Sequence, residues 1–242
     1  MKKKLILLLS MAMCGQYANA KVTLLEHFTK ANKIDNKFYV AEDVSSEHKG
    51  QLNGKFKFVD ARFGKGAIGS SDFDDIVFNA NNIVNPSEGS IELWITVDKD
   101  FDKLNTNQRI LRVNFDKHNQ IVLYYNLKEQ HLVFWMKDED TEPSVSRYHS
   151  KNIAALIASQ GALDWKKGEH HHICLSWSPK VQKLYIDGVL NSRAYFSSVT
   201  AVPTDNSKLI MFTEEDKALI FDELRIWDNM KEPENITVRP SR

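Results

Sequence analysis

The sequence predicts an all-β protein, an antiparallel sandwich of two sheets with one short helix near residues 152–160. Short alternating or apolar stretches recur about every 8–12 residues and are separated by turn signals. The clearest hairpin covers residues 169–190, where two alternating arms lead to Asp187 and Gly188, a pair suited to the positive φ values of a two-residue turn. Its apolar face, which carries Ile173 and Trp177, has to be covered by a second sheet.

The first twenty residues have the pattern of an export signal. Lysines occupy positions 2–4, an apolar run covers residues 5–14, and Ala18 and Ala20 provide a small-x-small cleavage site. The apolar run is too short to span a bilayer, and no later stretch approaches the 18 apolar residues that a membrane helix needs. We therefore expect a signal peptide at residues 1–20, no integral membrane span, and a periplasmic or extracellular mature chain.

The composition of the mature chain limits its partners and its domain count. Without the three lysines of the signal peptide, 29 basic and 32 acidic residues remain, which argues against sequence-independent nucleic-acid binding. The full sequence has a hydrophobic content of 42%, which is enough for a real core. We expect one domain at residues 21–230 and a polar C-terminal tail at 231–242. The one mature cysteine, Cys174, lies within a strand among apolar neighbours and is expected to be a buried hydrophobic residue.

The chain before the hairpin contains a series of strand patterns separated by turns. Residues 29–53 are largely polar and irregular, whereas 120–127 and 131–137 are apolar on both faces, as expected for central strands. The expected strands are 22–28, 37–40, 55–59, 67–68, 76–78, 90–97, 109–115, 120–127 and 131–137.

One helix is expected, at residues 152–160. Three alanines and Leu156 favour helix there, Asn152 is a suitable N-cap, and Gly161 is a suitable end. After the hairpin, the expected strands are 195–196, 208–212 and 218–227.

Four segments, in order, carry a resemblance to a known family. They are Arg62-Phe-Gly-Lys-Gly-Ala with the acidic turn at 72–77, Gly89-Ser-Ile-Glu-Leu-Trp-Ile, the hairpin at 168–190, and Phe221-Asp-Glu-Leu-Arg-Ile-Trp. The chain thereby resembles the laminin-G-like, concanavalin A-like lectin/glucanase superfamily over roughly residues 55–230. The resemblance implies a two-sheet jelly roll that acts in binding or adhesion, often of carbohydrate, and often holds a structural calcium ion. One departure is His170, where the family has Trp.

Aromatic side chains are the leading candidates for ligand binding. Tyr148 and Tyr195 are expected on loops, where a rigid scaffold commonly carries its binding residues. Tyr124 is a third candidate. Packing between the sheets is expected of Trp135 and of one residue of the Tyr124–Tyr125 pair.

Two groups of residues are candidate calcium ligands. The acidic turn contains Asp72 and Asp74, whose carboxylates supply the oxygen ligands that calcium prefers. The resemblance implies a second group, Glu26 on the first strand and Asp222 on the last, because this family often links its terminal strands. Asp98 begins an acidic series like that of a calcium loop, but the later positions lack the required Gly and Glu, so a solvated turn is expected.

The histidine triplet allows a zinc site but favours a structural role. His170 and His172 point to the same side of a strand, and two such imidazoles can share a zinc ion. No third ligand follows from the spacing. No nucleotide cofactor is expected, because the glycine pattern at 64–69 leads into a strand and not into a helix.

These patterns predict a recognition module more than an enzyme. Glucanases of the sandwich fold place three carboxylates on one strand as Glu-x-Asp-x-x-Glu, and the Glu214-x-Asp216 pair lacks the third. We expect an exported, non-catalytic module, with a glycan as the leading ligand. The alternatives are a protein-interaction or adhesion module of the cell envelope, and a glycan-processing enzyme with a non-obvious site.

Overall fold

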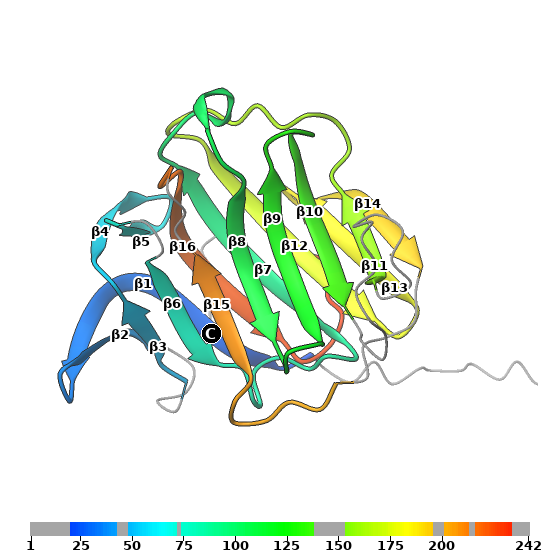
Figure 1. Ribbon diagram of the computed structural model, residues 1–242, viewed down its shortest axis with the longest axis horizontal. Coiled ribbons are helices and arrows are strands. Elements are labelled where there is room, and N and C mark those ends of the chain that lie inside the picture. Colours follow the sequence, from blue (N-terminus) through cyan, green and yellow to red (C-terminus); the bar gives the residue numbers. More distant parts are fainter. Residues whose placement is uncertain are drawn as a thin grey trace, which may run out of the picture.

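The computed structural model contains sixteen strands within the residues that it describes, which are 20–42, 48–71, 74–137, 153–195, 201–212 and 216–233. Figure 1 looks onto one layer of a sandwich, with β8, β9 and β10 in front of β7 and β12. Every strand pairing is antiparallel. The all-β antiparallel sandwich expected from the sequence is confirmed.

The strands form two layers, here called sheet I and sheet II. Sheet I contains, in spatial order, β11 (Ile153–Ala158), β10 (His131–Lys137), β9 (Gln120–Asn126), β8 (Gln108–Asn114), β15 (Lys208–Phe212), β6 (Asp75–Asn79), β3 (Gly50–Asn53) and β2 (Lys37–Glu42). Sheet II contains β1 (Val22–Ile34), β16 (Leu219–Trp227), β7 (Gly89–Val97), β12 (His170–Ser178), β13 (Val181–Ile186) and β14 (Val189–Tyr195). A single-turn 3-10 helix, η1 (Phe101–Lys103), follows β7.

The long strand β1 joins the two layers. It pairs with β16 of sheet II near its start and with β2 of sheet I toward its end, with a register irregularity between Glu26 and Ala31. Hydrogen bonding therefore continues from one layer into the other at this edge. At the opposite edge, β11 lies against β13 and β14.

The core lies between the two sheets. Residues from both sheets point into it, and its largest fully buried side chains include Trp177 of sheet II and Tyr125 and Phe134 of sheet I. One buried polar contact crosses the interior, because Nε2 of Gln182 donates to the carbonyl of Phe134 over 3.3 Å. Burial of apolar area of this extent is the main stabilising term of such a sandwich.

The hairpin expected at 169–190 is confirmed. β12 and β13 pair from Ile173 opposite Ile186 to Ser178 opposite Val181. The next turn joins β13 to β14 through Asp187 and Gly188, with φ values of 51° and 78°. Both values lie in the left-handed region that a two-residue hairpin turn requires.

The predicted helix at 152–160 is wrong, because residues 153–158 form strand β11. This strand pairs with β10, with Leu156 opposite Trp135 and Ala158 opposite Val133. Alanine favours helix only weakly, and pairing with an apolar strand at the sheet edge outweighs this preference. Strand β3, within the stretch expected to be irregular, is a further difference.

The glycine-rich stretch at 64–69 forms a strand and not a phosphate-binding loop. It is β5 (Gly64–Gly69), which pairs with β4 (Phe56–Ala61) and touches β16 where Ala67 lies opposite Phe221. Gly64 has a φ of 113° in the turn. A Cβ atom at Gly66 would lie 2.6 Å from the carbonyl oxygen of Phe221, so that only glycine fits there.

The described part of the C-terminal segment lies across the outer face of sheet II. Oγ of Ser176 donates to the carbonyl of Lys231 over 2.5 Å, and the Lys231 amide donates to Oγ of Ser90 over 2.6 Å. The Glu232 carboxylate then pairs with Lys183 at 2.8 Å. Residues 231–233 therefore pack on β7, β12 and β13.

Candidate functional site

The outer face of sheet I carries a mixture of aromatic, cationic and amide side chains. Strand alternation explains why: Ile121, Leu123 and Tyr125 of β9 enter the core, so Val122 and Tyr124 point outward. The same alternation in β10 buries Leu132, Phe134 and Met136 in the core and leaves Val133 and Trp135 on the outer face. In β8 a register irregularity between Arg109 and Leu111 interrupts the alternation, so that Ile110 and Leu111 are both in the core while Arg109 and Arg112 both lie outside it.

The strand registers place these side chains in rows across the sheet. One row is Trp135, Val122, Arg112, Ile210, Val77, Gln51 and Tyr39. A second row of paired positions contains Val133, Tyr124 and Arg109. A third contains Phe212, Asp75 and Asn53. Trp135, Tyr124 and Arg112 are half-buried and Arg109 is exposed. Sheet I thus presents aromatic and polar groups together on one surface.

Two arginine side chains of this surface lie close to the same aromatic ring, that of Phe212. Cζ of Arg109 lies 4.7 Å and Cζ of Arg112 lies 5.3 Å from the centroid of the Phe212 ring. Burial lowers the pKa of Arg112, and the neighbouring charge of Arg109 lowers it further, while Asp75 opposes both effects. The Arg112 guanidinium group remains charged at neutral pH, because the ordinary pKa of arginine is far above it.

A chain of polar side chains continues from the arginines toward β2. Nδ2 of Asn53 donates to Oδ1 of Asp75 over 2.7 Å, and Nε2 of Gln51 donates to Oδ1 of Asn53 over 2.6 Å. Lys37 donates to the Gln51 amide oxygen over 3.4 Å. Amide groups both donate and accept hydrogen bonds, which suits a ligand rich in hydroxyl groups.

The predicted ligand residues are divided between the two sheets. Tyr124 lies on the outer face of sheet I, whereas Tyr195 ends β14 of sheet II with 74% of its surface exposed. Tyr148 lies outside the described residues. The expectation that Trp135 packs between the sheets is wrong, because its neighbours Phe134 and Met136 point into the core and Trp135 points away.

Arg109, Arg112 and Phe212 are site residues that the sequence patterns do not predict. Their meeting depends on β15, which lies between β8 and β6 although it follows β8 by about a hundred residues in the chain. Alternation in β8, with Leu111 and Val113 in the core, is a signal that Arg112 points outward, whereas the outward position of Arg109 depends on the register irregularity between Arg109 and Leu111.

The three histidines of β12 have separate environments. His170 is exposed, with Nδ1 2.7 Å from Oγ1 of Thr96. His172 lies 5.1 Å from the Trp94 ring and is 2% exposed, and burial lowers its pKa to about 4. These two residues share a face, as expected. Across the described ranges, no three His, Cys, Asp or Glu side chains gather closely enough for a metal ion, so no third zinc ligand joins them.

His171 points to the opposite side and packs against Trp165. The two rings are stacked, with centroids 4.0 Å apart and planes 9° apart. Nδ1 of His171 lies 2.9 Å from Oδ2 of Asp187, and its Nε2 lies 3.3 Å from Oε2 of Glu169. Burial would raise the pKa of Asp187, but hydrogen bonds from His171 and from the His172 amide outweigh this effect and lower it. This arrangement indicates a structural role for His171.

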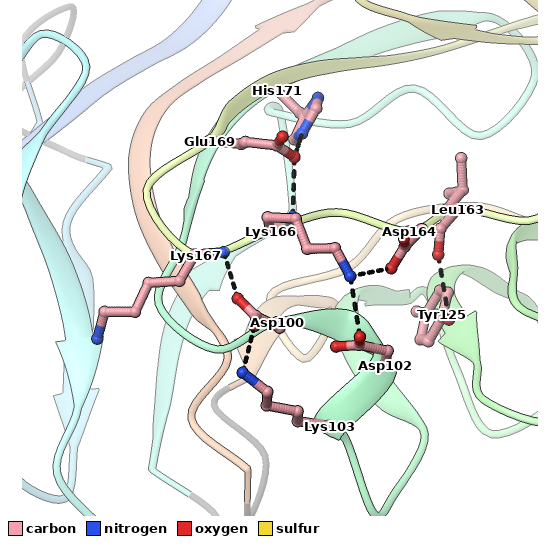
Figure 2. A network of polar contacts seen from close by, with 10 residues as sticks. All are labelled: Asp100, Asp102, Lys103, Tyr125, Leu163, Asp164, Lys166, Lys167, Glu169 and His171. Carbon is pink, nitrogen blue, oxygen red and sulfur yellow. Dashed lines mark hydrogen bonds and ion pairs between the residues drawn. The ribbon is translucent and has the colours of Figure 1, made fainter.

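The acidic turn after β7 pairs with lysines, as expected for a solvated turn. Figure 2 shows Nζ of Lys166 between the carboxylates of Asp102, at 2.9 Å, and Asp164, at 2.5 Å. Asp100 pairs with Lys103 at 2.5 Å, a contact that is also drawn in Figure 2. These ion pairs fasten the turn to the segment that precedes β12.

The candidate calcium ligands differ in their surroundings. Asp74 is buried and its Oδ2 accepts hydrogen bonds from the amides of Ser70 and Ser71. Asp72 lies outside the described residues. Asp74 therefore closes the turn between β5 and β6 through backbone hydrogen bonds.

Glu26 and Asp222 lie on the directly paired strands β1 and β16, with Glu26 opposite Leu224. Their exposed fractions are 1% and 0%. Oε1 of Glu26 accepts from the Phe28 amide over 2.7 Å, and Oδ2 of Asp222 accepts from the Phe63 amide over 2.8 Å. Burial of two carboxylates on neighbouring strands suits a cation, but calcium takes six to eight oxygen ligands. In the described part of the chain no third acidic side chain completes the set, so carbonyl groups or water would have to do so.

Asp216, from the pair considered for catalysis, holds a loop. It pairs with Lys99 and accepts hydrogen bonds from the amides of Asn105, at 2.8 Å, and Thr106, at 3.0 Å. Burial alone would raise its pKa, but these donors outweigh burial and lower the pKa to about 2. A carboxyl group with so low a pKa is ionised and does not act as a general acid near neutral pH. Glu214 lies outside the described residues.

Solved structures share this fold over most of the chain. The fourth domain of AbnA, an extracellular arabinanase from Geobacillus stearothermophilus in complex with arabinotriose, matches with a TM-score of 0.59 and 17% identity over 87% of this chain and 94% of that one. The botulinum neurotoxin serotype D binding domain matches with a TM-score of 0.57 and 15% identity over 86% of this chain and 48% of that one. The binding domain of Paraclostridial Mosquitocidal Protein 1 matches with a TM-score of 0.57 and 19% identity over 85% of this chain and 49% of that one.

At these identities the likeness shows the fold alone. This chain spans about half the length of each of the two toxin chains. No curated protein matches the sequence. Among the described residues no helix is long and apolar enough to cross a membrane. The family model of the concanavalin A-like lectin/glucanases superfamily matches residues 70–237, more than half of the chain. The chain therefore belongs to the concanavalin A-like lectin/glucanases superfamily.

Proposed function

We propose that the protein is an exported, non-catalytic recognition module that binds carbohydrate on the outer face of sheet I. The observation that carries this proposal is the placement of Trp135 and Tyr124 on the same surface as the polar chain of Gln51, Asn53 and Asp75. An aromatic ring can cover the apolar face of a sugar, while amides and a carboxylate bond to its hydroxyl groups. Family membership, and a solved neighbour that holds arabinotriose, support the choice of ligand class.

The position of Lys21 supports export with cleavage after Ala20. The Lys21 backbone nitrogen donates to Oδ1 of Asp228 over 2.9 Å, and the Asp228 amide donates back to the Lys21 carbonyl over 3.1 Å. Cleavage would turn this nitrogen into an ammonium group that faces the same carboxylate. Mass spectrometry of the secreted or periplasmic protein should find Lys21 as the first residue. A chain that keeps residues 1–20 in the cytoplasm would contradict export.

A glycan array tests the proposed ligand class, with variants that separate the two sheets. Tyr124→Ala and Trp135→Ala should each weaken binding of the best glycan by about tenfold, the value of one well-buried aromatic contact. Tyr195→Ala, on sheet II, should leave it unchanged. Absence of binding to every glycan would contradict the proposal. Release of reducing sugar from a polysaccharide would show instead that the protein is an enzyme.

The edge strand β14 favours a second candidate function, protein interaction or adhesion in the cell envelope. Val189, Leu190 and Tyr195 expose 68%, 41% and 74% of their surfaces along it. Within the described residues, β14 forms strand pairing with β13 alone, although β11 of sheet I also lies against it. An edge without a pairing strand is where a strand of a partner would add. Capture of one envelope protein, lost in Leu190→Lys, together with no glycan binding would support this function over the first.

We also propose that Glu26 and Asp222 contribute to a structural calcium site. Their burial on paired strands supports the proposal, since a bound cation offsets the cost of burying two carboxylates. Calcium should then raise the melting temperature of the chelator-treated protein by mass action. Asp222→Asn should abolish that rise, whereas Asp60→Asn, on the exposed surface, should not. An unchanged melting temperature after chelation would contradict the proposal.

A further inference from the structure

The β1–β2 hairpin extends beyond the layers that hold the core. Val40 of β2 is buried and lies opposite Ala31 of β1, and the pairing continues for three more positions, to Ile34 opposite Lys37. At the rise of a strand, the last pair therefore lies about 10 Å along the hairpin from the buried Val40. Figure 1 shows this end of the hairpin at the margin of the molecule (blue, lower left). Residues 29–38, here called the hairpin tip, are exposed except for Ala31.

A tight turn closes the hairpin tip. Asp35 and Asn36 have φ values of 45° and 63°, the left-handed values that a type I′ turn requires at both of its central positions. Such a turn fixes the register of the two arms, so the side chains on either side of it keep defined positions.

Each face of the hairpin tip carries one apolar side chain and one lysine. Cross-strand partners share a face, and successive residues of a strand alternate between faces. Ile34 lies opposite Lys37 on one face, and Lys33 lies opposite Phe38 on the other. Ile34 and Phe38 expose 38% and 51% of their surfaces. Both faces thus keep apolar surface in water, and a covering partner would remove that cost.

The hairpin tip is also positively charged. Lys30, Lys33 and Lys37 are exposed, and Asp35 is the one acidic residue of the tip, so three positive charges and one negative charge leave a net charge of +2. Lys37 donates to the amide oxygen of Gln51 over 3.4 Å. No carboxylate of the described residues forms an ion pair with any of the three lysines. The tip therefore complements a surface that is negatively charged.

We propose that the hairpin tip binds the surface of a bilayer that contains anionic phospholipid. This site is separate from the proposed carbohydrate site on the outer face of sheet I. Ile34 and Phe38 leave water when the tip enters the headgroup layer, and the lysines pair with lipid phosphates. The layer still offers hydrogen-bond partners to the polar turn, which limits the depth of insertion.

Two other occupants fit the hairpin tip less well. A ligand that lies on sheet I would contact one face of the tip, whereas the apolar and cationic side chains occupy both. A second copy could add to the edge of β1, which from residue 29 onward pairs with β2 alone among the described strands. Lys30 and Lys33 oppose this, because lysines on an edge strand repel those of a second copy.

Flotation of the mature full-length protein with lipid vesicles tests the proposal. The vesicles are phosphatidylcholine alone and an equimolar mixture of phosphatidylcholine and phosphatidylglycerol. Phe38→Ser removes apolar surface from the tip, Lys33→Gln removes a positive charge, and Asp35→Asn removes the negative one. Val202→Ser and Lys208→Gln are matched controls, since Val202 is 78% exposed and Lys208 is exposed at the start of β15.

We expect binding to the mixed vesicles, and binding to phosphatidylcholine alone that is at least about tenfold weaker. Lys33→Gln should weaken binding by about fivefold, the usual value of one lysine near an anionic surface. Phe38→Ser should weaken it by about fivefold, the value of burying half of a phenylalanine side chain. Asp35→Asn should strengthen it, and each control should change it by less than about twofold. Added salt should weaken it.

A fluorescent dye separates insertion from adsorption. An environment-sensitive dye attached through Phe38→Cys should shift to the blue when mixed vesicles are added, and the same dye attached through Val202→Cys should not. The buried Cys174 leaves the engineered position as the accessible thiol of the mature chain. An unshifted dye at position 38 on bound protein would contradict entry of the tip into the headgroup layer.

Three results would overturn the proposal. The first is no binding to the mixed vesicles, or equal binding to both kinds of vesicle. The second is a loss of binding in Val202→Ser or Lys208→Gln as large as that in the tip variants. The third is a dimer in sedimentation velocity that is lost in Phe38→Ser, together with no vesicle binding, which would assign the tip to a second copy. Melting temperatures check that each variant folds, and the two charge variants still decide if Phe38→Ser does not.

Discussion

The ring of Trp165 stacks on the ring of His171, with centroids 4.0 Å apart and planes within 9° of parallel. Trp165 also packs 5.1 Å from Phe101 of η1 and is 6% exposed. An aromatic residue of the segment that precedes β12 therefore packs against the second histidine of the triplet. The stack thus fastens the segment before β12 to the start of that strand.

Replacing Trp165 with Ala should destabilise the fold by about 3 kcal/mol, the usual cost of emptying a buried tryptophan position. Trp165→Phe should cost less, since it keeps a ring to stack on His171. Urea unfolding followed by circular dichroism measures both. Trp135→Ala, on the outer face of sheet I, is the control and should cost clearly less. Equal losses for Trp165→Ala and Trp135→Ala would contradict the structural role of the stack.

Asp216 should make stability fall in acid. Its folded pKa of about 2 lies below its ordinary value of 3.8, so its contribution is complete above about pH 4 and disappears as the pH falls through about 2. Asp216→Asn should lower the free energy of unfolding at pH 7 by on the order of 1–2 kcal/mol, a range that allows for solvent screening. At pH 2 the variant and the parent should be nearly equal. A difference that stays constant from pH 7 to pH 2 would argue against this role.

Cys174 should be chemically inert in the folded protein. Its side chain is fully buried on β12, and burial raises the pKa of its thiol well above the ordinary range. Because the thiolate is the reactive form, labelling by a thiol reagent at pH 8 should require unfolding. Labelling rates with and without urea measure this. Rapid labelling of the native protein, at the rate of free cysteine, would be incompatible with the buried position of β12.

Local patterns predicted the elements whose signals lie close together in the chain. The β12–β13 hairpin and the turn at Asp187 and Gly188 follow from alternation and turn chemistry within about twenty residues, and both are confirmed. The helix predicted at 152–160 is wrong because the structure of this segment depends on residues that are distant in the chain. Its alanines favour helix locally, but its structure is decided by pairing with β10, which the local sequence does not record.

The candidate site was only partly predictable. The residue type of Tyr124 makes it a ligand candidate from the sequence. Arg109, which lies opposite Tyr124, contacts Phe212 only because β8 and β15 meet through long-range pairing. Trp135 was assigned to the core because β10 is apolar on both faces. That pattern does not distinguish a core face from an outer face that binds ligand.

Hydrogen exchange with and without a bound glycan tests the central claim most directly, because it locates the binding surface on one sheet. Using the best glycan from the array at saturation, exchange should slow in peptides from β8, β9, β10 and β15. Peptides from β13 and β14 should exchange at the same rate in both states. Protection confined to β13 and β14, with β8 to β10 unchanged, would contradict binding on sheet I.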